Sequence, residues 1–254
     1  MIEKLNPGEI KQNLHTELIA SDILVFDTIS STQDYIFDNL HSLKKGTVVL
    51  ADTQEKGRGR LGRLWHSPPG TGIYMSILFP DISIPEVHSQ ISLFTSLTLT
   101  EFLDDRYKLP FKVRWPNDIM VNGFKIAGVL GEQRYNTVVV GVGLNVNNNT
   151  HQLVEGASSL YLLTGQFQNR NTIVADFLNH YGRSISEWKE VGFEYIRRMW
   201  LNYTSLKGKP VRAQVDSRFI EGVVEDLDSD CSLVIRNSHG YLLKIPISNL
   251  VMIR

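Results

Sequence analysis

The fold class of this chain is decided by one stretch, residues 111–132, which read FKVRWPNDIMVNGFKIAGVLGE. Apolar and charged side chains alternate over 111–115, and this period of two predicts a strand whose charged face carries Lys112 and Arg114. The pair Asn122-Gly123 between two apolar runs is typical of a two-residue hairpin turn. The runs on either side of it are therefore expected to pair antiparallel.

The elements around this hairpin extend it into a larger sheet. A further turn is expected at Tyr135-Asn136, which leads into the valine-rich run 137–147. Upstream, apolar runs predict strands at 23–26, 47–51 and 73–79. The expected fold class is α+β, a mixed, largely antiparallel sheet with helices packed on it. Helical patterns are predicted in three segments, at about 31–43, 86–108 and 171–203.

The last part of the chain differs in composition from the rest. The run Lys207-Gly208-Lys209-Pro210 marks the change, so we expect one domain of residues 1–206 and a second of residues 207–254. Short apolar runs separated by turn residues follow it, and this spacing predicts a small β-barrel. Its four expected strands are 211–215, 219–227, 232–236 and 241–245.

Composition excludes several classes of protein. With 254 residues, 42% hydrophobic and 21% charged, the chain has an ordinary globular composition. A net charge of −1 argues against nucleic-acid binding by whole-surface attraction. The short segment before the first strand leaves no room for an appended DNA-binding helix-turn-helix. The single Cys231, the absence of a signal-peptide pattern and the lack of a long apolar run predict a cytoplasmic protein without a membrane segment.

Residues 55–66, EKGRGRLGRLWH, are the strongest candidate for a binding loop. Arginines alternate with glycines, so guanidinium groups and uncovered backbone amides can converge on one anionic group. A glycine-rich loop is entropically costly to order, so we expect it to order around its ligand. Two other interpretations stay open, an RNA-binding tract and a solvated basic turn. A Walker phosphate loop is excluded because no Gly-Lys-Ser/Thr follows.

Residues with hydroxyl groups lie at the start of the helix predicted at about 31–43, and they have two interpretations. Ser30 with Gln33, or Ser31 with Asp34, fits a helix capping box. The same hydroxyls at a helix N-terminus also suit a ligand. Local sequence does not decide between capping and binding.

Lys125 and three glycines are further candidates. Lys125 lies in an apolar strand, either as a strand-end lysine that reaches solvent or as a point charge for a carboxylate or phosphate. Gly128 leaves room beside it. Gly141 and Gly143 alternate along the valine-rich strand, so they share one face, where another group is expected to approach closely. His88, His151, His180 and His239 lack metal-ligand spacing, and no protein metal site is expected.

Four motifs stand in a fixed order along the chain: Gly57–Arg63 (GRGRLGR), Arg114–Asp118 (RWPND), Lys125–Glu132 (KIAGVLGE) and Gly141–Asn147 (GVGLNVN). Together they resemble the biotin protein ligase family over about residues 23–254. The resemblance implies a catalytic domain like those of class II aminoacyl-tRNA synthetases and biotin synthetases, with an SH3-like C-terminal barrel. It also implies the ligase-only type without a DNA-binding repressor segment. Arg114 replaces the family's usual lysine, which keeps the charge but not a compact ammonium.

The resemblance implies an activity in two steps. Biotin and MgATP form biotinyl-5′-AMP, and biotin then passes to one lysine of a biotin carboxyl carrier protein or domain. Two anions meet in the first step, so positive charge and positioning supply most of the catalysis. The implied catalytic residues are Arg60, Arg63, Lys125 and Asp118, the last as a hypothesis for steering the acceptor lysine. The residues implied for biotin are Ser31, Thr32, Gln54, Gly57, Arg58, Arg60, Lys125, Gly128, Gly141 and Gly143, and those for ATP are Arg60, Arg63, Trp65, Asn117, Lys125 and Asn145.

The resemblance also implies how ligands and partners bind. Arg58 is expected to use mainly its backbone toward biotin, and Mg²⁺ to bind mainly through the ATP phosphates. The loop 57–63 is expected to be mobile when empty and to close over biotin before ATP, which shields the acyl-adenylate from water. The expected partner is the carrier protein, with no DNA and no membrane, and a homodimer stays open. The rival functions are a lipoate-protein ligase-like transferase and a non-catalytic biotin- or RNA-binding module.

Overall fold

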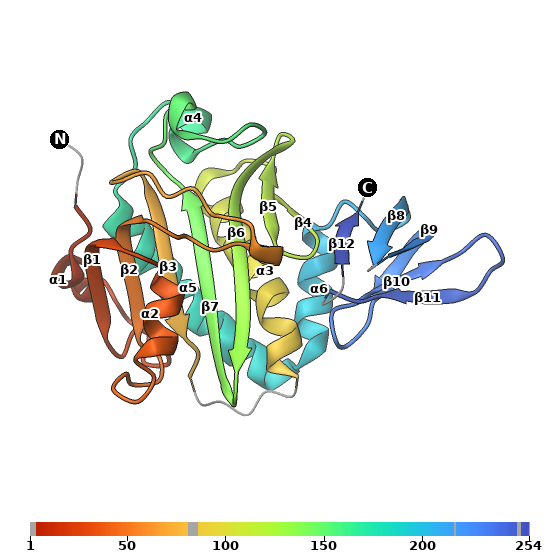
Figure 1. Cartoon of the computed structure of the whole chain (residues 1–254), viewed down its shortest axis with the longest axis horizontal. Helices are drawn as coiled ribbons and strands as arrows, with labels where there is room; N and C mark the ends of the chain where they lie inside the picture. The colour runs from red at the N-terminus through yellow and green to blue at the C-terminus, as the bar shows by residue number, and fades with distance from the viewer. Residues whose placement is uncertain (1–3, 81–85, 216, 248–249, 254) are drawn as a thin grey trace.

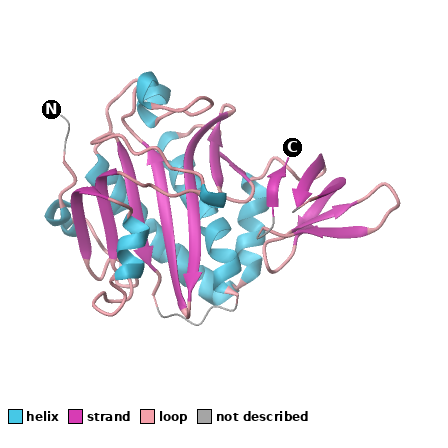
Figure 2. Ribbon diagram, in the orientation of Figure 1, coloured by secondary structure: helices cyan, strands magenta, loops and turns pink. Residues whose placement is uncertain are grey.

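The computed structural model describes residues 4–80, 86–215, 217–247 and 250–253. A large sheet carries helices on both faces, and a smaller sheet lies at one end of it (Figure 1). Strands make up most of the middle of the molecule (Figure 2). The large sheet has seven strands in the order β1-β2-β3-β7-β6-β5-β4. Their bounds are β1 (Ile23–Ile29), β2 (Val48–Gln54), β3 (Gly72–Leu78), β4 (Lys112–Arg114), β5 (Asp118–Val121), β6 (Phe124–Arg134) and β7 (Thr137–Asn145).

The hairpin predicted at Asn122-Gly123 is confirmed. β5 and β6 run antiparallel on either side of it. Both turn residues have positive φ, 49° for Asn122 and 84° for Gly123, a backbone that these two residue types tolerate best. β6 and β7 also pair antiparallel, and Gly128 lies opposite Gly143. Among the described strands of this sheet, β1 and β2 form the one parallel pair, so the predicted mixed, largely antiparallel sheet is confirmed.

Different helices cover the two faces of the large sheet. Helix α2 (Thr32–Asp38) lies on one face, and the helices α3 (Val87–Tyr107), α5 (Arg170–Val191) and α6 (Phe193–Tyr203) lie on the other (Figure 1). Along β7, Val139 packs with Ile36 of α2, whereas Val140 belongs to the main core. Alternation along the strand therefore puts Gly141 and Gly143 on the α2 face, which confirms that they share one face.

The long helix predicted at 86–108 is confirmed as α3, but it is buried on more than one face. It lies between the sheet and the helices α5 and α6, so polar residues of its outer faces are buried as well. The Thr95 hydroxyl bonds with the Tyr181 hydroxyl at 2.6 Å. The Thr100 hydroxyl donates to the Ser96 carbonyl oxygen at 2.7 Å. These bonds offset the cost of burying hydroxyl groups.

Two helix predictions need correction. Helix α2 ends at Asp38 instead of continuing to residue 43, because the Asn39 side-chain amide donates to the Tyr35 carbonyl oxygen and the chain turns there. The region predicted as helical over 171–203 is two helices, separated at Gly192, whose φ of 72° and ψ of −151° interrupt the helical backbone. None of the described helices is long and apolar enough to cross a membrane. The remaining short elements are α1 (Pro7–Gln12), η1 (Arg60–Gly62), η2 (Thr150–Gln152) and α4 (Leu160–Thr164).

The smaller sheet has one strand more than the sequence predicted. Its order is β11-β10-β9-β8-β12, and its described pairs are all antiparallel. The additional strand, β12, has four residues at the end of the chain and follows the last strand that the sequence predicted. The bounds are β8 (Pro210–Val215), β9 (Arg218–Leu227), β10 (Leu233–Arg236), β11 (Leu242–Ile245) and β12 (Leu250–Ile253).

Hydrogen bonds join the smaller sheet and its turns to the segment after β4 and to the helices α3 and α6. The buried indole of Trp115 donates from Nε1 to the Cys231 carbonyl oxygen at 3.0 Å. The Gln90 side-chain amide of α3 donates to the Ser229 carbonyl oxygen at 2.7 Å. Asp226 on β9 accepts from Arg197 on α6 at 2.9 and 2.5 Å. The turn between β9 and β10 therefore holds Trp115, the first residue of the Trp-Pro-Asn-Asp motif, in place.

The Asp226–Arg197 pair predicts an acid-dependent loss of stability. Its hydrogen bond to Arg197 is the largest cause of the lowered pKa of Asp226, whose ordinary value is 3.8. A carboxyl whose pKa is lower in the folded state stabilises the fold above its unfolded value and loses that contribution as the pH falls through its folded value. We expect Asp226→Asn to lower the thermal midpoint at neutral pH, and the difference from the parent chain to vanish in acid. Thermal unfolding followed between neutral and acidic pH measures it, and a difference that persists at the acid end contradicts the assignment.

Candidate active site

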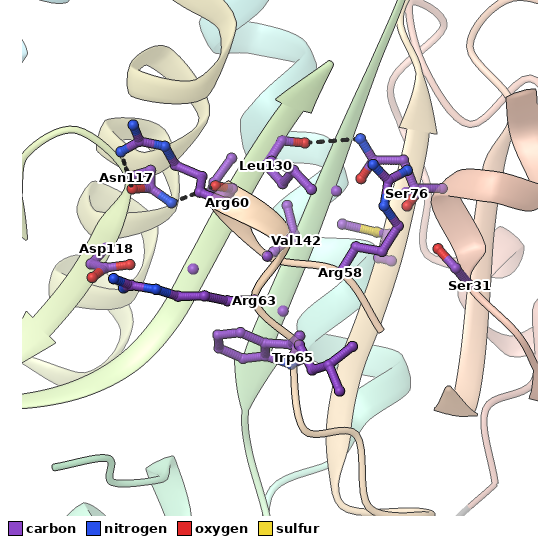
Figure 3. Close-up of a pocket in the computed structure, with 18 of the residues that line it drawn as sticks. Ser31, Arg58, Arg60, Arg63, Trp65, Ser76, Asn117, Asp118, Leu130 and Val142 are labelled. Carbon is purple, nitrogen blue, oxygen red and sulfur yellow. Dashed lines mark hydrogen bonds between the residues drawn. The ribbon is translucent and has the colours of Figure 1, made fainter. Parts of the chain in front are cut away.

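A cavity of about 300 Å³ opens on the α2 face of the large sheet. The start of α2, the loop 58–65, the segment 114–118 and the strands β3, β6 and β7 line it. Figure 3 shows the loop side chains Arg58, Arg60, Arg63 and Trp65 around it. All the site residues predicted from the sequence line this cavity except Gly57 and Asn145.

The start of α2 forms a neutral polar end of the cavity. Ser31 is the N-cap of α2, and its Oγ accepts from the Asp34 backbone N–H at 3.3 Å. The Thr32 backbone N–H donates to Gln54 Oε1 at 2.9 Å, and the Thr32 hydroxyl lies 2.7 Å from the Ser76 hydroxyl. Of the two capping alternatives, the structure therefore has Ser31 with Asp34. Three predicted biotin residues, Ser31, Thr32 and Gln54, lie together here with Ser76.

The loop is held by its own backbone. The Gly59 N–H donates to the Arg63 carbonyl oxygen and the Trp65 N–H to the Gly57 carbonyl oxygen, both at 2.8 Å. A Cβ on Gly57 would lie 2.5 Å from the Trp65 carbonyl oxygen, so only glycine allows this close approach. Gly57 therefore shapes the base of the loop and does not line the cavity.

The Trp65 indole lies on two paired glycines of the sheet. A Cβ on Gly143 would come within 2.3 Å of the ring, and one on Gly128 within 3.0 Å. The ammonium of Lys125 lies 5.3 Å from the ring centroid, a cation–π contact. The buried indole Nε1 has no hydrogen-bond partner among the described residues. The room left by Gly128 and Gly143 is filled by this ring, whereas Gly141 lies under the side chain of Gln33.

Lys125 points into the site and faces a carboxylate. Its Nζ lies 2.5 Å from Asp118 Oδ1, and an Arg114 nitrogen lies 2.6 Å from Asp118 Oδ2. The backbone of Lys125 is fixed as well, because its N–H donates to the Gly156 carbonyl oxygen and its carbonyl accepts from the Ser158 N–H, both at 2.9 Å. Lys125 therefore lies at the cavity wall, paired with Asp118, and its role toward a ligand stays a prediction.

Two further cations come from the loop. Arg60 donates to Asn117 Oδ1 at 3.4 Å and to the Ile247 carbonyl oxygen at 2.9 Å. Burial lowers the pKa of Arg60, and the positive charge of Arg63 lowers it further, against the opposing effect of Asp118. Arg63 is exposed and points toward Asp118 (Figure 3). Within the described part of the chain, it has no ion-pair partner. At this end of the cavity, Arg63 thus carries a positive charge that no ion pair among the described residues neutralises.

Some functional candidates differ from the sequence prediction. Asn145 is buried outside the cavity, and its amide donates to the Ser158 carbonyl oxygen at 3.0 Å. Ser76 was not predicted as a site residue, because the strand pattern carries no signal for it. The ion pairs of Arg58 with Asp34 and Glu132 were not predicted either, although Arg58 and Glu132 lie in two of the quoted motifs. No group of three or more metal-ligating side chains occurs among the residues that the structure describes.

Comparison with known proteins places this architecture in a family. Residues 25–149 match the biotin/lipoate A/B protein ligase family. The bifunctional ligase/repressor BirA of Bacillus subtilis is 30% identical over 248 residues, which cover 93% of this chain and 76% of that protein. The biotin--[acetyl-CoA-carboxylase] ligase of Mycobacterium tuberculosis is 27% identical over 195 residues, covering 75% of this chain and 73% of that protein.

A solved structure shares the whole arrangement. The biotin protein ligase of Aquifex aeolicus, in complex with biotin and ATP, superposes with a TM-score of 0.80 at 27% identity and covers 92% of this chain and 99% of that one. The chain belongs to the biotin/lipoate A/B protein ligase family. Within it, the relatives and the solved structure to which it is similar are biotin protein ligases.

Proposed function

We propose that this chain is a biotin protein ligase, which activates biotin with ATP to biotinyl-5′-AMP and transfers biotin to one lysine of a biotin carboxyl carrier protein. One observation carries the proposal. A single cavity has neutral hydrogen-bonding groups at one end and cations at the other. An uncharged ureido ring suits the first end, and a carboxylate beside phosphates suits the second.

In the first step, a biotin carboxylate oxygen bonds to the α-phosphorus of ATP. The bond from that phosphorus to the bridging oxygen breaks, and pyrophosphate leaves with the electron pair. Lys125, Arg60 and Arg63 offset the negative charges that meet there. Asn117 lies against Arg60 and contacts the phosphates, which would hold Mg²⁺ and let it offset their negative charge. Trp65 holds the adenosine, and Ser31, Thr32 and Gln54 hold the ureido ring.

In the second step, the neutral amine of the acceptor lysine bonds to the acyl carbon. AMP leaves with the electron pair of the broken acyl–oxygen bond, and the amine proton is released. Asp118 lies beside Lys125 at the cavity wall, so its carboxylate is placed to attract the incoming ammonium. The carrier protein is the partner in this step.

We also propose the domain arrangement that serves these steps. Residues 1–206 form the catalytic domain, and residues 207–254 form an SH3-like barrel. Closing this barrel takes strand contacts in addition to the pairs of the five-stranded sheet. The Ile247 carbonyl oxygen accepts from Arg60, so the smaller domain contacts the loop directly. The loop 57–63 opens to admit biotin and then ATP, and it shields the acyl-adenylate from water once closed.

Biotin-dependent ATP–pyrophosphate exchange by the purified chain tests the proposed function. We expect exchange with biotin, and at least roughly a hundredfold less with lipoate or octanoate, because a site built to hydrogen-bond a polar group strongly rejects an acid without it. Equal exchange with lipoate would favour the lipoate-protein ligase-like alternative. Biotin binding without any exchange would favour a non-catalytic binding protein.

A further inference from the structure

The side chain of Arg58 connects three separate elements at the neutral end of the cavity. One of its terminal nitrogens lies 2.7 Å from Asp34 Oδ1 on α2, and the other lies 2.6 Å from Glu132 Oε1 on β6. Two hydrogen bonds from one guanidinium to two carboxylates are charge-assisted and directional. Asp34, Arg58 and Glu132 are called the ion-pair clamp below.

Gln33 extends the clamp toward the floor of the cavity. Its Nε2 donates to Glu132 Oε2 at 2.8 Å and to the Leu130 carbonyl oxygen at 3.3 Å. Its Oε1 would lie 2.4 Å from a Cβ on Gly141. Both oxygens of Glu132 are therefore engaged, one by the loop and one by α2. Gln33 is 3% exposed, so this connection is almost fully screened from water.

The positive charge of the Arg58 guanidinium is stabilised by the carboxylates that it contacts. Burial lowers the pKa of the Arg58 guanidinium, but the nearby carboxylates of Glu132 and Asp34 raise it more, and the net pKa is raised. The three side chains are 25% to 36% exposed, so water screens the pairs only partly. The clamp is thus an electrostatic connection that added salt weakens.

The clamp fixes two parts of the cavity relative to each other. Ser31 and Thr32, at the start of α2, immediately precede Gln33 and Asp34. Arg58, from the loop, lines the same cavity. The cationic end is held by other contacts, because Arg60 bonds to Asn117 and Ile247 and Lys125 pairs with Asp118. None of these contacts involves the clamp.

We propose that Asp34, the Arg58 side chain and Glu132 are positioning residues that set the affinity for the acid substrate, while leaving ATP binding and the chemical step to the cationic end. The proposal rests on the proposed function for its substrate. In this proposal the Arg58 side chain has a positioning role that is separate from any contact between the Arg58 backbone and biotin.

The test compares Glu132→Gln and Asp34→Asn with the parent chain in ATP–pyrophosphate exchange. We expect each substitution to raise the KM for biotin by roughly tenfold, the effect of losing one charge-assisted hydrogen bond. The KM for ATP and kcat at saturating biotin should stay within about twofold. Adding salt should raise the KM for biotin of the parent chain and change that of the double variant less. Asp38→Asn is the matched control, because Asp38 lies exposed on the same helix and outside the cavity.

Limited trypsin digestion supplies a second measurement that needs no substrate. The loop bonds after Arg58, Arg60 and Arg63 should be cleaved roughly tenfold faster in Glu132→Gln than in the parent or Asp38→Asn chains, because local opening becomes easier when the clamp is broken. Absence of exchange in the parent chain would overturn the proposed function and leave digestion to decide on the clamp. Unchanged cleavage with an unchanged KM for biotin would overturn the clamp, and so would an equal rise in the KM for ATP.

Discussion

Replacing Lys125 with alanine lowers the rate of biotin-dependent ATP–pyrophosphate exchange by roughly a hundredfold or more, the range measured when one preorganised charge-stabilising donor is removed. The backbone of Lys125 is held on one side by the sheet and on the other by the segment 156–158. Its ammonium lies at the cavity wall, where the carboxylate of biotin and the α-phosphate meet in the proposed reaction. Initial rates at saturating biotin and ATP measure the loss.

The Lys125→Ala substitution removes the ammonium group and is expected to leave the fold intact. Asp118 stays paired in the variant, because Arg114 contacts its other carboxylate oxygen at 2.6 Å. Lys112→Ala is the matched control. Lys112 lies exposed on β4, the edge strand beyond β5, and donates to the Asn202 carbonyl oxygen at 3.0 Å, away from the cavity. We expect exchange by Lys112→Ala within about twofold of the parent chain. If Lys125→Ala retained a comparable rate, the proposed role of Lys125 would be wrong.

The parts of the fold that the sequence predicted are those fixed by local chemistry. The Asn122-Gly123 turn has a backbone that few other residue pairs adopt, so its sequence determines the hairpin. Alternation over Phe111–Trp115 placed Phe111, Val113 and Trp115 inside, and all three are buried. The hairpin then aligns Asp118 with Gly128 across β5 and β6, and Gly128 with Gly143 across β6 and β7. The strand pairings of β5 with β6 and of β6 with β7 therefore bring motifs that are separate in the sequence to one cavity.

The contacts that the sequence did not predict join residues far apart along the chain. Arg58 and Glu132 are 74 positions apart, and Arg60 and Ile247 are 187 apart. Periodicity and turn residues report only on neighbours, so they carry no information on such pairs. The Trp65 side chain is an example, since its place on Gly128 and Gly143 follows from the path of the whole loop. The roles of residues within the site were predicted from the resemblance of four motifs to a known family. The ion-pair clamp could be identified only from the structure.

A buried ion pair outside the cavity gives the second large expected effect, a loss of stability. Arg170, the first residue of α5, is 1% exposed, and one of its nitrogens lies 2.7 Å from Asp52 Oδ1 on β2. The same nitrogen donates to the Gly72 carbonyl oxygen on β3 at 3.1 Å. Arg170 therefore ties the helix layer to two strands. Arg170→Met keeps much of the side-chain volume but leaves the Asp52 carboxylate buried without its cation.

We expect Arg170→Met to lower the free energy of unfolding by about 3 to 5 kcal/mol, because an uncompensated buried charge costs more than the pair itself contributes. Asp52→Asn in the same chain removes that charge, so the double variant should recover part of the loss and the two effects should not add. Lys4→Met is the control, since the Lys4–Asp27 pair is 74% and 75% exposed and should contribute at most about 1 kcal/mol. Urea unfolding followed by both tryptophan fluorescence and circular dichroism measures all four chains. If Arg170→Met cost no more than Lys4→Met, the carboxylate of Asp52 would have to be neutral or hydrated in the folded protein, and the buried pair would not hold α5 to the sheet.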